Sequence, residues 1–326
     1  VIESDDQQHI LHPVQLSIRN FANTKALLKS SDNSTTRSFR LSGESESAPS
    51  SFSWQGSFDK TTPTGTFEIN KLPAQEFLER TTRITDISAK GSTDIRGKLT
   101  VTRDKQVPLA ILLDQGSAQI TSLSLEEKGR SLLQSATVKL SPLQVDKSTV
   151  QLGNIFFDNS ALQLQGDAPQ ALLDIFGDKS KITLQGVDFK GKIIIPQDAD
   201  RPPLEINDVH LQIKDLEKKK LTHENFAFSA SFDKNGSLNA KGQVSVAPLK
   251  GVIELAVAGI PATTLLPLFS TSRYTVEPAT MVSAAGSYDL ASKSFNGKAE
   301  LSSGPFRDSK KENSFPFSKA VLGKIF

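Results

Sequence analysis

Apolar and polar residues alternate along most of this chain. The pattern is clearest in the last third, where Phe226, Phe228 and Phe232 and then Val244 and Val246 occupy every second position or multiples of it. A two-residue period predicts β-strands, because successive side chains in a strand point to opposite faces of the sheet. One face is apolar and the other polar, which is typical of antiparallel sheets covered on one side only. A doubly wound α/β fold is therefore disfavoured.

Three short segments interrupt the alternation, at residues 73–80, 169–176 and 261–269. Each begins with proline, which is favoured at the first helical position, and continues with apolar residues three or four positions apart. We expect one or two helical turns at each. The last ten residues, 317–326, also have helical spacing. Since the chain opens on Val1 without a leader and stops within this pattern, we expect the natural protein to continue past Phe326.

An internal repeat organises the strand pattern. One copy has Gly56, Gly65, Pro73 and then Ala89-Lys-Gly91; the other has Gly242, Gly251, Pro261 and then Ala285-Gly286. The order strand, turn, strand, short helix, strand is shared, while the later spacing differs in a way that a loop around residues 274–278 would absorb. A degenerate third copy would lie near residues 169–188.

The repeat suggests a division into three parts. We predict a first β-repeat module at residues 1–130, a middle β segment with its short helix at 131–225, and a second β-repeat module at 226–326 that ends in a truncated helix. The predicted fold is mainly β: an elongated, curved antiparallel sheet, shaped as a groove and built from repeated strand modules with a few short helices.

Composition excludes several function classes. The formal charge is +2, from 38 basic and 36 acidic residues, so no net field recruits nucleic acid. The chain has no cysteine, which excludes thiolate metal sites and disulfides. No apolar run approaches the roughly 20 residues that span a bilayer as a helix.

Enzymatic motifs are missing. His9 and His12 lack the spacing and the glutamate of a zinc-protease helix, and the Gly177-Asp-Lys-Ser180 string lacks the upstream glycine of a phosphate-binding loop. His210 lies at a polar strand position and His223 at a predicted turn. We predict no catalytic residue, no cofactor and no metal, and expect a non-enzymatic protein.

The segment "PLKGVIELAVAGIPATTLLPLF", followed by "AAGSYDL", resembles the AsmA-like superfamily of Gram-negative envelope proteins, closest to the branch with the uncharacterised DUF748 domain. Residues 226–290 match best and residues 52–101 loosely. The resemblance implies a periplasmic protein, tethered to a membrane through parts outside this segment, which binds or conducts lipid along an apolar β-groove and supports outer-membrane integrity. It implies phospholipid or another acyl-chain lipid as ligand, and other envelope proteins as partners.

Eight apolar positions that alternate in register are the candidate groove lining: Phe226, Phe228, Phe232, Val244, Val246, Ile253, Leu255 and Val257. An acyl chain on such a surface would gain about 0.8 kcal/mol per buried methylene. Two alternatives stay open. The same side chains could form the closed core of a structural or adaptor scaffold without ligand, or clustered acidic and histidine side chains could form a hydrolase site.

Overall fold

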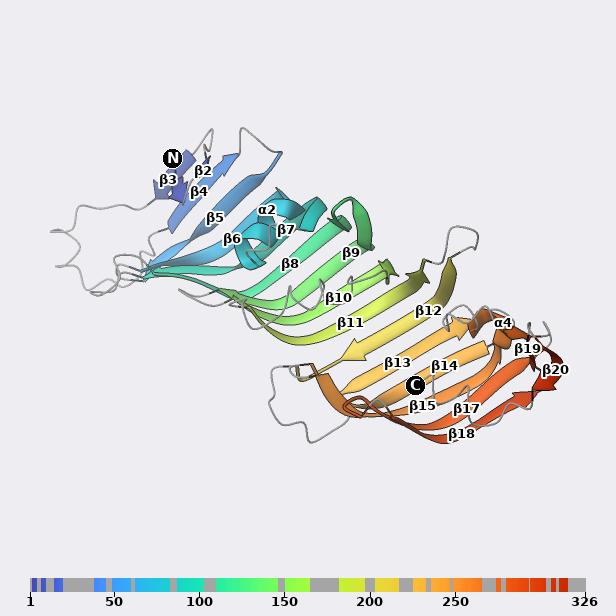
Figure 1. Ribbon diagram of the computed structural model, residues 1–326. Helices are drawn as coiled ribbons and strands as arrows, with labels where there is room; N and C mark the ends of the chain where they lie inside the picture. The colour runs from blue at the N-terminus through green and yellow to red at the C-terminus, as the bar shows by residue number, and fades with distance from the viewer. Residues whose placement is uncertain are drawn as a thin grey trace. The chain divides into compact units, whose positions relative to one another are not determined.

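In the part of the chain that it describes, the computed structural model consists almost entirely of β-strands (Figure 1). Two short helices accompany them among these residues, α2 (Ala74–Thr82) and α4 (Ala262–Leu265). The structure describes residues 2–4, 7–9, 15–19, 38–44, 49–59, 62–82, 87–102, 110–145, 150–164, 182–196, 203–216, 225–232, 236–246, 249–265, 274–276, 280–292, 294–302, 306–308 and 311–315. The predicted mainly β architecture of curved strands with few helices is confirmed.

The chain divides into two compact units. The first comprises Val1–Ile155 and Leu173–Leu184, and the second comprises Phe156–Leu172 and Gln185–Phe326. The three-module division at residues 130 and 225 stays a prediction. The segments 169–176 and 317–326, for which we expected helices, lie outside the described residues.

In the first unit, each strand is hydrogen-bonded to the next strand in the chain, from β3 to the start of β10. The strands are β3 (Gln15–Arg19), β4 (Ser38–Glu44), β5 (Ser51–Asp59), β6 (Thr62–Pro73), β7 (Ile87–Thr102), β8 (Ala110–Glu127), β9 (Arg130–Val145) and β10 (Val150–Gln163). A separate two-stranded ribbon joins β1 (Ile2–Ser4) to β2 (Gln7–His9).

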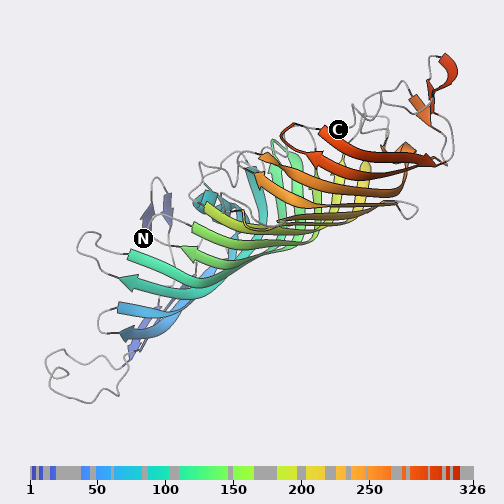
Figure 2. The same ribbon diagram turned by 90° about the horizontal axis from the view of Figure 1, so that it is seen from below.

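In the second unit, the order runs from the end of β10 through β11 (Ile182–Ile195, from Gln185 on), β12 (Leu204–Ile213), β13 (Phe226–Phe232), β14 (Gly236–Val246), β15 (Leu249–Pro261), β17 (Met281–Asp289) and β18 (Ser294–Ser302). Figure 2 shows these strands side by side from below. A small sheet pairs β16 (Tyr274–Val276), β19 (Phe306–Asp308) and β20 (Lys311–Phe315).

One neighbouring pair departs from the antiparallel pattern. The Leu164 amide donates to the Ile194 carbonyl at 2.9 Å, and Gly191 lies against the backbone of Ser160. Residue numbers therefore rise together along β10 and β11, so these strands run in the same direction, as their arrows do in Figure 1. Parallel neighbours need a connection of about a dozen residues or more, which the chain between Leu164 and Ile182 supplies.

The repeat seen in the sequence reappears as a repeated structure. In both copies two antiparallel strands, β5–β6 and β14–β15, lead through a proline into a short helix, and the next long strand returns to pair with the second. Both second strands bulge just before the proline, at Lys71 and Gly259, whose φ angles are +57° and +60°. The extra length of the second copy contains β16.

Bulges recur throughout the sheet, and six of them follow one rule, whereas the two in β9, at Leu132 and between Leu140 and Leu143, contain no residue with positive φ. At each of these six, a residue with positive φ directly precedes a residue of the apolar side of the sheet. That residue therefore lies three positions, instead of two, after the previous residue on the same side. The steps are Ile69 to Leu72, Leu113 to Gly116, Ile120 to Leu123, Phe157 to Ser160, Ile206 to Val209 and Val257 to Ile260. Each bulge keeps the apolar residues of its strand on one side.

Asp208 tests this rule. Its φ is +47°, its side chain is exposed, and Val209 behind it is 1 % exposed. A left-handed conformation costs a residue with Cβ about 1–2 kcal/mol and glycine almost nothing. We expect Asp208→Val to lower the free energy of unfolding by about 1–2 kcal/mol, while Asp208→Gly stays within about 1 kcal/mol of the parent.

Urea unfolding of both variants measures the difference. Equal stability of the valine and glycine variants would show that the bulge places no constraint on this residue.

Candidate functional site

The strongest candidate surface is the apolar face of the second unit. Strand register aligns its members in rows across the strands. One row contains Phe226, Gly242 and Ile253, and the next contains Leu211, Phe228, Ala240 and Leu255. Further members lie on β17 and β18, where Ala284 pairs with Ala299 and Tyr288 with Phe295. We call this surface the apolar face; it comprises Val187, Phe189, Ile193, Ile206, Val209, Leu211, Ile213, Phe226, Phe228, Ala230, Phe232, Leu238, Ala240, Gly242, Val244, Ile253, Leu255, Val257, Ile260, Val282, Ala284, Gly286, Tyr288, Phe295, Gly297, Ala299 and Leu301.

Seven of the eight predicted lining residues belong to the apolar face as defined, and Val246 follows Val244 two positions further along β14. The exposure of the seven differs. Phe226, Phe228, Ile253, Leu255 and Val257 are half-buried. In contrast, Phe232 and Val244 are buried, at 7 % and 5 % exposed. The side chain of Val246 lies outside the described residues. Whether these side chains line a groove that holds a ligand stays a prediction.

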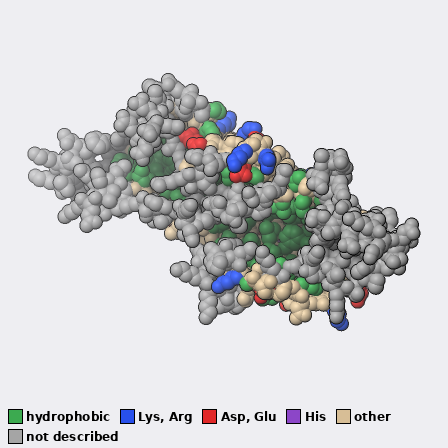
Figure 3. Space-filling model, viewed as in Figure 1, with side chains coloured by type: hydrophobic (Ala, Val, Ile, Leu, Met, Phe, Trp, Pro, Cys, Tyr) green, Lys and Arg blue, Asp and Glu red, His purple; other side chains and the backbone are tan. Residues whose placement is uncertain are grey.

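Charge is absent from the apolar face. Its 27 residues, as defined by the strand pairing above, include no Asp, Glu, Lys, Arg or His. Figure 3 shows hydrophobic side chains gathered in a hollow over β12 to β14, with a second such patch over β5 and β6 of the first unit. An uncharged face with half-buried phenylalanine and leucine side chains suits an apolar ligand.

The first unit has an equivalent surface. Trp54 packs edge-on against Phe39 with ring centroids 4.5 Å apart, and Phe39 also contacts Phe58 at 5.2 Å. Phe39 is directly opposite Gly56, which in turn faces Gly65. A Cβ on Gly56 would lie 2.0 Å from the Thr64 carbonyl oxygen, so the close strand approach here requires glycine.

Sequence reasoning missed part of the apolar face. Tyr288 and Phe295 were not assigned because Gly286 and Gly297 interrupt the apolar pattern of their strands. In the structure a Cβ on either glycine would come within 2.8 Å of the Phe295 ring, so this ring occupies the space above both. Counting glycine as an apolar-face residue would have revealed it, because the two-residue alternation then continues through Gly286 to Tyr288 and from Phe295 to Gly297.

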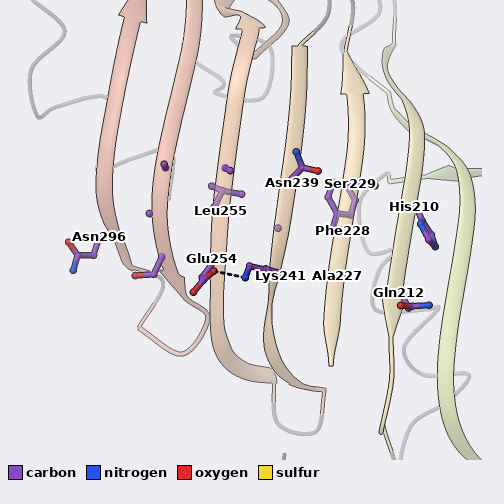
Figure 4. Close-up of a pocket in the computed structure, with 15 residues that line it drawn as sticks. His210, Gln212, Ala227, Phe228, Ser229, Asn239, Lys241, Glu254, Leu255 and Asn296 are labelled. Carbon is purple, nitrogen blue, oxygen red and sulfur yellow. Dashed lines mark ion pairs between the residues drawn. The ribbon is translucent and has the colours of Figure 1, made fainter. Parts of the chain in front are cut away.

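The opposite, polar face of the second unit carries the ionisable groups. A hollow of about 750 Å³ lies there, lined among others by His210, Asn239, Lys241, Glu254 and Asn296 (Figure 4). Lys241 Nζ and Glu254 Oε2 form an ion pair of 3.1 Å. Hydrogen bonds from Ser292 and Ala291 lower the pKa of Asp289 in the turn between β17 and β18.

The hydrolase alternative concerns the histidine and acidic side chains. His210 Nε2 lies 3.1 Å from Asp188 Oδ1, and Gln212 donates to the other carboxylate oxygen at 3.2 Å. In Figure 4 the imidazole is turned away from Ser229, its cross-strand neighbour. No group of three or more potential metal ligands occurs within the described ranges. His9, His12 and His223 have no described side chain.

Comparisons with known proteins give no assignment. No protein-family model, no curated protein and no solved structure matches this chain. The resemblance to the AsmA-like superfamily thus remains a prediction from the residues quoted for it. Within the described part of the chain, no helix has the length and hydrophobicity needed to cross a membrane.

The separation of the two faces can be tested by chemical labelling, because the chain has no native cysteine. Leu255 and Val257 are half-buried on the apolar face, whereas their neighbours Ala256 and Ala258 are exposed on the polar face. We expect single cysteines at 256 and 258 to react with a charged, water-soluble maleimide several-fold faster than cysteines at 255 and 257. Rates without alternation along β15 would contradict the assignment of faces.

Proposed function

We propose that this protein is a non-enzymatic lipid-binding protein of the bacterial envelope, which holds acyl chains against the apolar face. The observation that carries the proposal is the uncharged apolar face of the second unit, whose Phe226, Phe228 and Leu255 remain half-buried in the described structure. The periplasmic location, the membrane tether outside this segment and the contribution to outer-membrane integrity belong to the same proposal and rest on the family resemblance.

Acyl chains fit this surface for an energetic reason. Each methylene moved from water onto apolar side chains contributes about 0.8 kcal/mol, so a chain that covers several strands gains more than any single contact supplies. Directional hydrogen bonds are not needed, and the described apolar face offers no charged group for them. Such a surface would select by length and hydrophobicity rather than by head group.

A closed core is the alternative, and the burial of Phe232 and Val244, which lie at opposite ends of the β13–β14 pair, favours it at these two positions. A scaffold for envelope proteins would keep the whole face covered by protein. Half-buried Phe228 distinguishes the two ideas, because in the lipid-binding protein its ring contacts ligand and in the scaffold it contacts only protein.

Photocrosslinking at this position separates them. We expect p-benzoylphenylalanine at Phe228, a replacement that keeps the aromatic ring, to crosslink lipid in cells of a Gram-negative host, detected as a mass increase of the purified protein. The same residue at Ser229, one position along β13 on the polar face, is the matched control and should give little lipid adduct. Protein-only adducts at 228, or equal lipid adducts at both positions, would argue against the proposal.

A further inference from the structure

The polar face of the first unit contains two adjoining hollows that the lipid proposal does not use. One, of about 640 Å³, is lined by side chains of β5 to β8, and the other, of about 300 Å³, by side chains of β7 to β9. Arg96 and Ser117 line both, so the hollows form one trench. We call it the polar trench; its side chains are Gln55, Ser57, Thr64, Thr66, Asp94, Arg96, Lys98, Gln115, Ser117, Gln119, Lys139 and Ser141.

The lining of the polar trench contains three cations, Arg96, Lys98 and Lys139, and one acid, Asp94, so the lining charge is +2. Two further acids border it on neighbouring strands, since Glu68 is aligned with Arg96 and Asp114 with Lys98. The Asp94 carboxylate already accepts a hydrogen bond from the Lys71 amide at 2.8 Å, in the bulge before α2. The hollow of the second unit differs, since its Lys241 is paired with Glu254.

Two of the cations are available to a ligand. Lys98 and Lys139 are exposed, and neither side chain forms a hydrogen bond or an ion pair with a residue that the structure describes. Arg96 has only a long contact, 3.9 Å, to Glu68. By contrast, the nearby Lys90 is bound to Glu126 at 2.9 Å, and this hydrogen bond and charge lower the pKa of that carboxyl group.

Strand register gives the spacing of these charges. Lys139 is aligned through Gln119 with Asp94, so it lies two strands and four residues from Lys98. With about 4.8 Å between strands and about 3.3 Å per residue, the two backbone positions are about 16 Å apart, with Arg96 between them. Two cations on β7 and one on β9 therefore line this stretch, a spacing that suits an extended ligand with several anionic groups.

The rest of the lining narrows the chemistry. Ser57, Thr64, Thr66, Ser117 and Ser141 supply hydroxyl groups, and three glutamines supply amides. Along β5 to β7 the trench also touches the backbone of Gly56, Gly65 and Gly97. Hydroxyls and amides bind the hydroxyl groups of sugars, while the cations bind carboxylates. We propose that the polar trench binds an acidic oligosaccharide.

Calorimetric titration of the full chain tests this with three probes: hexagalacturonate, the neutral maltohexaose of equal length, and a linear polyphosphate of six units. We expect saturable binding of hexagalacturonate that weakens at least about tenfold when salt rises from about 0.05 M to about 0.5 M. Maltohexaose should bind much more weakly, and polyphosphate more weakly than hexagalacturonate, because it lacks hydroxyl groups for the trench.

Matched variants assign the site. Lys98→Gln with Lys139→Gln should weaken hexagalacturonate binding about tenfold or more. Lys250→Gln with Lys298→Gln removes the same charge from exposed positions of the second unit and should change it less than about twofold. All four lysines are exposed, so unchanged urea midpoints are expected. No saturable binding, equal losses in both double variants, equal affinity for maltohexaose, or tighter binding of polyphosphate would each overturn the proposal.

Discussion

The fold depends on keeping apolar side chains on one side of strands that are too long for an uninterrupted two-residue period. β8 and β9 have 18 and 16 residues. Sheets twist, and a regular register between long, twisted and curved strands is relieved by bulges. In this protein six bulges insert a residue with positive φ directly before a residue of the apolar side. At Gln115 and Ser122 the alternation of β8 slips twice, and Gly116 and Leu123 still point to the buried side.

This constraint also explains why the two repeats resemble each other in space. Lys71 and Gly259 have nearly the same φ, two residues before the proline that leads into a short helix. The bulge ends regular pairing of the second strand, and the helix then packs by its first residue: Ala74 and Ala262 are both 2 % exposed. A backbone amide of α4 reinforces the junction, since Ala262 donates to the Thr280 carbonyl at 2.8 Å. The residues that recur in the two copies thus produce the same strand-to-helix junction in both.

Much of this architecture was predictable from the sequence, because alternation reports faces directly. The strands around Phe226, Val244 and Leu255, the helices after Pro73 and Pro261, and the paired copies around Gly56 and Gly242 all followed from residue order. The bulges did not, since Asp208 and Ser122 are common in turns and carry no local mark of a left-handed conformation within a strand. The parallel direction of β11 was also missed, because alternation is identical for both directions. The polar trench was invisible, since Arg96 and Lys139 become neighbours only through register.

The two proposed binding surfaces, the apolar face of the second unit and the polar trench of the first, depend on different physical interactions. The apolar face would act through burial of hydrocarbon, which is insensitive to salt, and the polar trench through charge, which salt screens. Native mass spectrometry of the protein, released from envelopes by several progressively milder extractions, tests the central claim most directly. The account predicts lipid-bound species that persist at high salt and whose added mass follows the acyl composition of the host. Apo protein alone under every extraction would contradict it.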